Sequence, residues 1–211
     1  MKLSPQKFNT WLNNIGQRFA WRRSYACPCV SPHSGAAQPG CQHCGGKGRI
    51  WDAPVEGISG IAGQKVQTSW AQFGVFEPGD VVLTLPSDSA LYDMGRFDRV
   101  VMLDSTQPFS TLLTRGSGTT ERLLEPIKVI DRVFWIDDSK QIVDGGVPTI
   151  TADGEPQWSS GEPPQNKTYT ITGRQHPEYF VWGEFPQDRA HHGGADLPRR
   201  VVLRKFDLFG R

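Results

Sequence analysis

Four cysteines, the only ones in the 211-residue chain, all lie between positions 27 and 44. They form one pair, Cys27 and Cys29, and after eleven further residues a second pair, Cys41 and Cys44. Two close pairs separated by a loop can direct four thiolates at one centre, and Zn²⁺ prefers such a tetrahedral, all-sulfur shell. We therefore predict a structural zinc site with Cys27, Cys29, Cys41 and Cys44 as ligands. Four protein ligands leave no coordination position for a substrate.

The residues around the cysteines favour metal binding over other uses of the thiols. Gly45, Gly46 and Gly48 allow the tight turns that a metal-binding loop needs. The start of the chain has no apolar signal segment, so we expect a reducing cytoplasm, where thiols bind metal more often than they form disulfides. Two disulfides, a redox pair, an iron–sulfur centre and free thiols remain alternatives. His33 and His43 are possible substitute ligands.

The rest of the chain has the pattern of a β protein. Its 23 Gly and 16 Pro place turn signals about every ten residues, and no alternation of strands with helices is visible. Alternating or apolar segments predict strands at Asp80–Leu85, Arg99–Leu103, Pro108–Thr114, Ile127–Trp135, Gln141–Val143, Thr149–Thr151, Thr168–Thr172, Glu178–Trp182 and Arg200–Phe206. Residues 64–76 are expected to add further β structure. We predict a mainly β fold, a β-sandwich or a barrel.

One helix is expected, at the N-terminus. Ser4 and Pro5 form a typical helix start, with Ser as N-cap and Pro in the first turn. Apolar residues then follow helical spacing at Phe8, Trp11, Leu12, Ile15 and Phe19. This predicts an amphipathic helix over residues 5–20. Its apolar face packs either on the chain's own core or on a neighbouring subunit.

These features divide the chain into four expected segments. They are an N-terminal helix at 1–24, a four-cysteine zinc-binding loop at 25–52, a β-rich core at 53–185, and a C-terminal loop and strand arm at 186–211. Residues 153–165 and 186–198 are rich in Pro, Gly and polar residues, which predicts long surface loops or extended arms. The basic and apolar run at 199–211 is hypothesised to dock on an adjacent subunit.

Composition and motifs exclude several classes of function. Lys and Arg total 23 and Asp and Glu total 22, which argues against a dedicated duplex-binding protein. No apolar run reaches the ~18 residues of a membrane span. No nucleophile, metalloprotease or phosphate-loop motif is present. Asp137-Asp138 and His191-His192 are expected to be solvated, and we predict a protein that is not an enzyme.

Several stretches together resemble structural proteins of tailed bacteriophages. They are Cys27–Trp51, Gly79–Ser89, Met94–Leu103 and Tyr169–Trp182. The combination is similar to the neck proteins, the connector or collar subunits between portal and tail in contractile-tailed phages. That resemblance implies a virion protein, made in the host cytoplasm, that forms a six- or twelve-fold ring of its own copies around the DNA channel. Its partners would be portal, adaptor or tail-completion proteins, with no sequence-specific DNA binding and no membrane.

The runner-up interpretation is a zinc-ribbon module that binds nucleic acid. Basic residues surround the cysteine loop, and two tryptophans flank it as candidates for base stacking. These residues are Arg18, Arg22, Arg23, Lys47, Arg49, Trp21 and Trp51. An enzyme acting in phage infection, or another binding protein, is a more remote alternative.

Overall fold

The computed structural model describes residues 4–72, 77–185 and 191–210 of a mainly β chain. The chain divides into two compact units, and the sequence of one is inserted in the sequence of the other. The barrel unit comprises residues 1–104 and 178–211, and the insert unit comprises residues 105–177. The expected division placed 53–185 in a single core, whereas this stretch is shared between the two units. Within the described residues, neither α-helix is long and apolar enough to cross a membrane.

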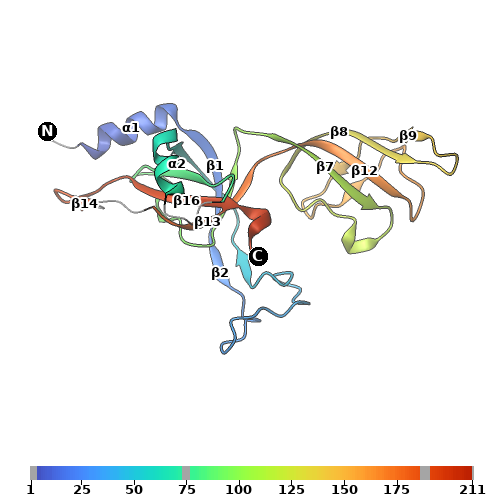
Figure 1. Cartoon of the computed structure of the whole chain (residues 1–211), viewed down its shortest axis with the longest axis horizontal. Coiled ribbons are helices and arrows are strands. Elements are labelled where there is room, and N and C mark those ends of the chain that lie inside the picture. Colours follow the sequence, from blue (N-terminus) through green and yellow to red (C-terminus); the bar gives the residue numbers. More distant parts are fainter. Residues whose placement is uncertain (1–3, 73–76, 186–190, 211) are drawn as a thin grey trace. The chain divides into compact units, whose positions relative to one another are not determined.

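The barrel unit is built on a closed, six-stranded antiparallel barrel, part of which is visible in Figure 1. In barrel order the strands are β1 (Gln17–Arg22), β4 (Val55–Ile61), β5 (Val81–Leu85), β16 (Arg199–Lys205), β13 (Glu178–Glu184) and β6 (Arg99–Met102). The barrel closes at β1, where Phe19 lies opposite both Gly57 of β4 and Met102 of β6. Every barrel strand has two partners, although β4 pairs with β5 only at Gly60 and Ile61.

Alternation along the barrel strands separates an interior core from an exterior one. Leu83, Leu203 and Phe19 are fully buried in the interior core. On the outer face of β5 and β16, Val82 and Val202 are also fully buried, under Trp70 and Phe185. Trp70 belongs to α2 (Gln64–Ala71). These two strands are therefore covered on both faces.

The helices differ from the sequence-based expectation. α1 (Pro5–Ile15) begins after Ser4, as expected, but it ends at Gly16 instead of continuing to residue 20. The amide of Gly16 donates to the Leu12 carbonyl at 2.7 Å, and the chain then extends into β1, so Phe19 is a barrel residue. The expectation of β structure over residues 64–76 is also wrong, because 64–71 form α2. Residues 73–76 lie outside the described residues.

The expected C-terminal arm is a barrel strand. β16 pairs with β5 on one side and β13 on the other, and Val201, Val202 and Leu203 are fully buried. The hypothesis that 199–211 docks on an adjacent subunit is therefore wrong for residues 199–205, since both edges of this strand are occupied. In the expected loop at 186–198, β14 (His191–His192) and β15 (Ala195–Asp196) form a short hairpin. Residues 186–190 lie outside the described part of the chain.

The insert unit has its own sheet and its own core. The sheet order is β7 (Gln107–Thr114), β12 (Thr168–Gln175), β8 (Ile127–Ile136) and β9 (Ile142–Asp144). A two-stranded sheet of β10 (Thr149–Ile150) and β11 (Pro156–Gln157) accompanies it; β10 falls on the strand expected at Thr149–Thr151, and β11 lies within the expected loop at 153–165. The core of this unit contains Leu113, Leu123, Ile130, Val133, Tyr169 and Ile171. Because this core is contained within residues 105–177, the insert unit has the anatomy of an independent domain.

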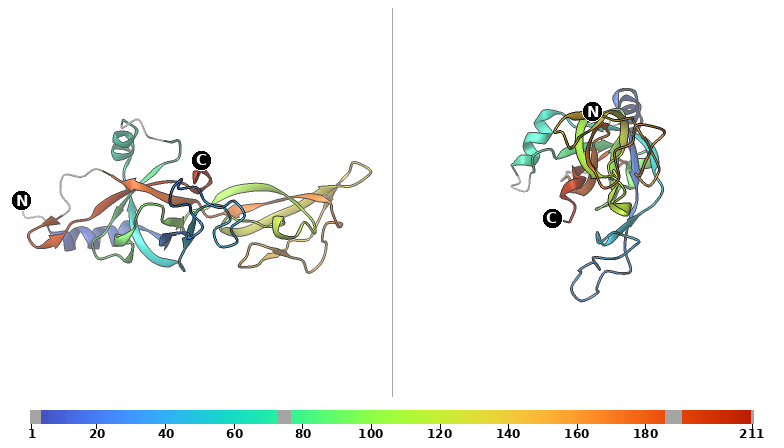
Figure 2. Two further views of the ribbon diagram at one scale, coloured as in Figure 1. Left: turned by 90° about the horizontal axis from the view of Figure 1, so that it is seen from below. Right: turned by 90° about the vertical axis from the view of Figure 1, so that its right-hand side faces the viewer.

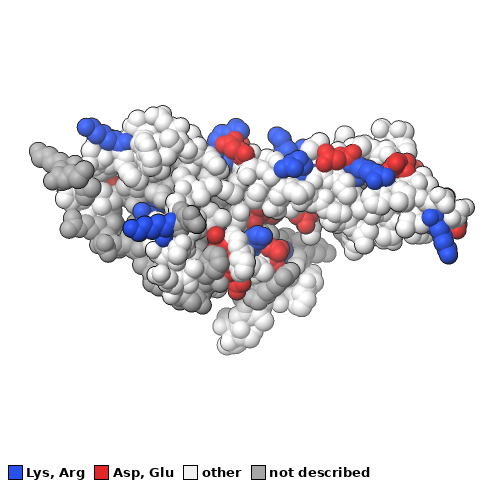
Figure 3. Space-filling model, turned by 45° about the horizontal axis from the view of Figure 1, so that its top comes forward, with Lys and Arg blue, Asp and Glu red and all other residues white. Residues whose placement is uncertain are grey.

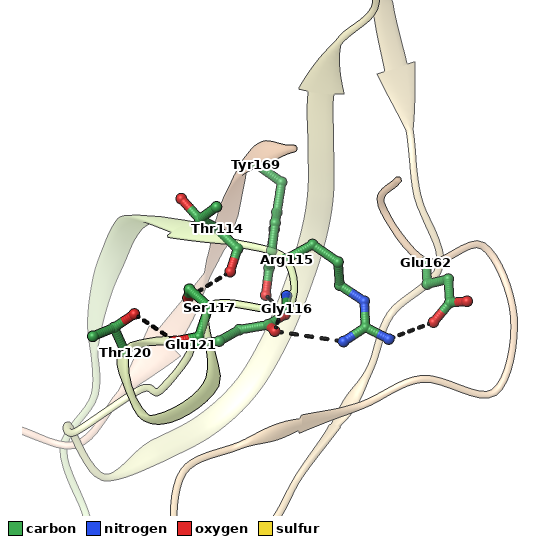
Figure 4. Close-up of polar contacts among 8 residues, drawn as sticks. All are labelled: Thr114, Arg115, Gly116, Ser117, Thr120, Glu121, Glu162 and Tyr169. Carbon is green, nitrogen blue, oxygen red and sulfur yellow. Dashed lines mark hydrogen bonds and ion pairs between the residues drawn. The ribbon is translucent and has the colours of Figure 1, made fainter. Parts of the chain in front are cut away.

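A buried carboxylate fixes the turn after β7 in the insert unit (Figure 4). Glu121 accepts hydrogen bonds from the Gly116 amide at 2.7 Å and from the Tyr169 hydroxyl at 2.9 Å. Arg115 pairs with Glu121 and with Glu162. Burial, and next the bond to Glu121, raise the pKa of Tyr169 well above its ordinary value. The carboxylate is saturated by donors, which is the arrangement of a structural group.

A second buried carboxylate ties the barrel unit together. Asp80 accepts from the indole of Trp70 at 3.1 Å and from the amide of Glu77 at 3.1 Å. Both its oxygens also face the guanidinium of Arg204, at 3.1 and 3.0 Å. The Asp80 side chain is wholly buried, so the pair is desolvated. Such a pair is strongly destabilising when one partner is removed, because the other charge stays buried.

Substitution Asp80→Asn is therefore expected to lower the free energy of unfolding of the barrel unit by about 3–5 kcal/mol. The measurement is urea unfolding followed by tryptophan fluorescence. Asp88→Asn is the matched control, since Asp88 is exposed, and it should change stability by no more than about 0.5 kcal/mol. Equal stability of the two variants would contradict a structural role for the Asp80–Arg204 pair.

Candidate metal centre

The four cysteines lie in a long loop at the end of a two-stranded hairpin. Its strands are β2 (Ser24–Ala26) and β3 (Arg49–Trp51), paired from Ser24 opposite Trp51 to Ala26 opposite Arg49. Residues 27–48 form the loop, which projects from the barrel strands in Figure 1 and in the right-hand view of Figure 2. We call strands and loop together the cysteine hairpin. Its paired strands bring Cys27 and Gly48 together, with the Cys27 amide donating to the Gly48 carbonyl at 2.9 Å.

The four sulfur atoms converge, as the spacing predicts. All lie within 4.8 Å of one another. The sulfurs of Cys27 and Cys41 are 3.8 Å apart, and those of Cys29 and Cys44 are 3.5 Å apart. A tetrahedral ion with sulfur ligands at about 2.3 Å separates those ligands by about 3.8 Å. Two of the sulfur–sulfur distances therefore lie close to the spacing of a tetrahedral thiolate shell, and none exceeds 4.8 Å.

The backbone around the second pair turns tightly about the sulfurs. Gly45 donates to the Cys41 carbonyl at 2.8 Å, and Gly48 donates to the Cys44 sulfur at 3.3 Å. Gly46 and Gly48 have φ values of 79° and 72°, a conformation that is costly for residues with a Cβ atom. A Cβ atom on Gly46 would also approach the Pro39 carbonyl oxygen to 3.0 Å. The glycines that follow the cysteines are thus required by the geometry of the loop.

Backbone amides and neighbouring thiols shift the pKa values of two of the cysteines in opposite directions. The backbone amides of Cys44 and His43 lower the pKa of the Cys41 thiol to about 6. For Cys29 the backbone amide of Gln38 lowers the pKa, but burial and the three neighbouring thiols together raise it to about 12. Ionisation of the Cys41 thiol is thus favoured, whereas ionisation of the Cys29 thiol is opposed. A bound cation removes that opposition, because it favours the charged form of every sulfur.

The sulfur positions do not fit the disulfide alternative. All four cysteines are free, and the sulfur separations are far above the ~2.05 Å of a disulfide bond. Among the described residues, His33 and His43 do not join the metal-ligand cluster, which consists of the four cysteines. The donor set that the structure assembles is therefore the one expected from the sequence.

An aromatic cluster that sequence patterns did not reveal lies at the base of the hairpin. Trp51 contacts Phe206 and Phe209, with ring centroids 5.6 and 5.7 Å apart, and its indole donates to the Phe97 carbonyl at 3.1 Å. Phe206 and Phe209 stack on each other at 5.6 Å. Phe209 also meets Phe180 of β13 edge-on at 5.0 Å. The C-terminal turn therefore joins the hairpin to the barrel. Only contacts between distant segments identify this cluster.

The nucleic-acid interpretation loses its proposed stacking residues. Trp21 is only 7% exposed, and its indole donates to Asp98 at 2.7 Å, so the expectation that it is free to stack is wrong. Trp51 is occupied by the aromatic cluster. Arg18 pairs with Asp104 at 2.8 Å.

The other polar residues singled out in the sequence are paired or exposed. Asp137 accepts from the Gln141 amide at 2.8 Å, and Asp138 pairs with Lys167 at 3.0 Å. His191 and His192 are exposed in β14. Each residue has an ordinary structural or solvated setting.

No protein-family model and no curated protein matches this chain.

The purified protein is expected to carry about one transition-metal ion per chain, since four thiolates complete one tetrahedral shell. The measurement is metal analysis by mass spectrometry after gel filtration. Cys44→Ser should lose most of the metal, because one ligand is removed. His43→Ala is the matched control and should retain it, although it neighbours Cys44. Metal loss in the histidine variant, or full metal content in the cysteine variant, would contradict the four-sulfur site.

Proposed function

We propose that this chain is a structural subunit of a tailed-phage virion, which forms a ring of its own copies in the neck between portal and tail. The observation that carries the proposal is the presence of two different exposed apolar surfaces, one on each unit. A closed ring is built from head-to-tail contacts, and such contacts need two distinct complementary faces on one subunit. The resemblance to phage neck proteins supports the same function.

The first surface is one face of α1. Phe8, Trp11 and Ile15 follow helical spacing and are 40%, 53% and 57% exposed. On another side of the helix, Asn9 and Ser87 exchange hydrogen bonds of 2.9 and 3.2 Å, which attach α1 to the barrel unit. The helix is thus fixed in place with an apolar face left uncovered by the described chain. That face fits docking on a neighbouring subunit.

The second surface lies on the outer face of the insert sheet. Leu112 of β7 is on the same row across the sheet as Phe134 of β8, with Thr170 between them. Ile136 and Ile142 lie directly opposite each other on β8 and β9, two residues further along β8. Leu112, Ile136 and Ile142 are exposed. Cross-strand neighbours share a face of a sheet, so these side chains form one apolar patch.

The polar surface fits repeated contacts between like subunits. On the face drawn in Figure 3, Lys and Arg side chains lie close to Asp and Glu side chains. The formal net charge is +1, so copies of the chain would repel one another only weakly. A subunit that lines a DNA channel must also let DNA pass, which agrees with this balance.

The metal centre has a structural role in this proposal, with Zn²⁺ as the ion. Four cysteines fill the tetrahedral shell, which leaves no position for a reacting group. The loop has few apolar residues, and a structural zinc ion can supply on the order of 10 kcal/mol toward folding such a segment. The buried carboxylates of Asp80, Asp98 and Glu121 are each held by several internal donors. These features support a protein that is not an enzyme.

The remaining features of the proposal follow from its place in the virion. The subunit would be made in the host cytoplasm and would contact portal, adaptor or tail-completion proteins in the neck. DNA would pass through the ring without sequence-specific binding.

The zinc-loaded full chain is expected to form a closed oligomer, measured by mass photometry and native mass spectrometry. Trp11→Asp should shift that oligomer to monomer, because a charge would enter the apolar contact. Leu112→Asp should do the same through the second surface. A mixture of these two variants is expected to give dimers, since each keeps one intact face.

Asn13→Asp is the matched control, because Asn13 is an exposed polar residue on the same helix. It should leave the oligomer unchanged. The ring proposal fails if the zinc-loaded chain is monomeric at all concentrations tested.

A further inference from the structure

Three cations near the base of the cysteine hairpin have no anionic partner in residues 4–72, 77–185 and 191–210. They are Lys47 in the cysteine loop, Arg49 at the start of β3, and Arg96 in the segment before β6, and we call them the hairpin cations. Nearby, Arg99 pairs with Glu178 and Arg204 pairs with Asp80. The structure thus neutralises the two neighbouring arginines and leaves the other three cations available to an external anion.

An aromatic ring lies against each of the hairpin cations, and Arg49 and Arg96 share the same ring. The guanidinium carbons of Arg49 and Arg96 lie 4.4 and 4.7 Å from the centroid of the Phe97 ring. The two carbons can therefore be no further apart than about 9 Å, the sum of those distances. The ammonium of Lys47 lies 4.7 Å from the centroid of Phe206. Contacts of this kind restrict the cations before any ligand arrives, which reduces the entropic cost of binding.

Phe97 is held in an unusual conformation at the centre of this cluster. Its φ is 74°, which is rare for a bulky residue with a Cβ atom. Its amide donates to the Val181 carbonyl at 2.8 Å, and its carbonyl accepts from the Trp51 indole. The strained backbone is thus fixed from the barrel and from the hairpin together. Strain that is enforced in this way is typical of a place where function requires one geometry.

The nearby carboxylates Asp98 and Asp52 do not neutralise the charge of the hairpin cations. Asp98 is buried, and its oxygens accept from Trp21, the Ser24 amide and the Gly95 amide. Asp52 accepts from the Tyr25 hydroxyl at 2.8 Å. Asp207, in the turn that carries Phe206, is exposed. Of these three described carboxylates, two are therefore engaged by donors within the barrel unit, and Asp207 is exposed.

We propose that the hairpin cations bind the phosphodiester backbone of nucleic acid. Arginine guanidiniums match phosphate oxygens in geometry, and duplex DNA presents one negative charge per about 1.7 Å of its axis. The guanidinium carbons of Arg49 and Arg96 are at most about 9 Å apart, so the two side chains can contact several neighbouring phosphates at once.

Contact is expected to involve phosphates and not bases. Phe97 already has two guanidiniums near its ring and the Phe209 ring edge-on at 6.0 Å, while Phe206 is stacked on Phe209. Base stacking needs a free aromatic face, and these rings are occupied. Contacts limited to the backbone carry no sequence information. This inference does not depend on ring formation, so either proposal can fail while the other holds.

The test is fluorescence anisotropy of labelled 20-base-pair duplex and 20-nucleotide single-stranded DNA with the zinc-loaded full chain. Both DNAs are expected to bind at 50 mM salt. If the three cations neutralise three phosphates, a plot of log K against the logarithm of the salt concentration should have a slope of about −2.7 for the duplex and about −2.1 for the single strand. The variant Lys47→Gln, Arg49→Gln, Arg96→Gln should bind at least tenfold more weakly, with a slope near zero.

A matched triple variant removes the same charge elsewhere. Lys65, Lys128 and Lys140 are exposed and form no ion pair among the described residues, so their replacement by Gln should leave affinity unchanged. Arg96→Gln alone should lower affinity, although Arg96 is outside the hairpin. Zinc content and thermal unfolding show whether each variant is folded.

Three outcomes would overturn the proposal. They are absence of binding to either DNA at 50 mM salt, equal loss of affinity in the two triple variants, and displacement of DNA by an acidic peptide that binds more tightly to the same cations. The last outcome would identify an acidic protein segment as the ligand instead.

Discussion

The carboxylate of Asp98 joins the parts of the barrel unit on which the candidate site depends. It accepts hydrogen bonds from the indole of Trp21 in β1, from the amide of Ser24 at the start of the hairpin, and from the amide of Gly95. A buried carboxylate is costly unless donors surround it, and here the donors come from three segments. The point where β1 passes into the cysteine hairpin is therefore fixed against the segment that carries Arg96 and Phe97.

Pairing of β6 with β13 allows a second unit to be inserted without opening the barrel. Val101 lies opposite Glu178, and Val100 lies opposite Tyr179, so the chain leaves the barrel and returns on adjacent strands. The insert needs no apolar residue from the barrel, because Tyr169, Ile171 and their neighbours form a separate core. Insertions with neighbouring ends are tolerated for this reason.

The metal centre, the apolar surfaces and the hairpin cations have different physical roles. The four sulfurs organise a loop that cannot form a core of its own. The face of α1 and the outer face of the insert sheet expose apolar area, on which the proposed contacts with other subunits rest. The hairpin cations offer charge that is already restricted by aromatic contacts. The proposed assembly and the proposed contact with nucleic acid rest on these three features.

Some of this could be predicted from the sequence because the signal is local. The spacing of Cys27, Cys29, Cys41 and Cys44 predicts their convergence, and it is confirmed, since a short loop can reach one centre in few ways. Strands such as β5 and β8 are confirmed because alternation of side chains or a short apolar run marks them. Local patterns fail where two periodicities compete. Phe19 continues the helical spacing of α1, yet Gly16 ends the helix and Phe19 becomes a barrel residue.

Only the tertiary structure decides which distant segments pair. Nothing in the local pattern of residues 199–205 distinguishes an exposed arm from a central barrel strand; the difference is made by β5 and β13 on either side of it. The same holds for the insert unit, whose two ends lie on paired strands although more than seventy residues of sequence separate them. Phe97 and Arg96 carry no motif, and their positions follow from contacts with Val181, Trp51 and Arg49. Residue spacing determines local geometry, whereas cooperative packing over long sequence separations determines the barrel and the surfaces that it presents.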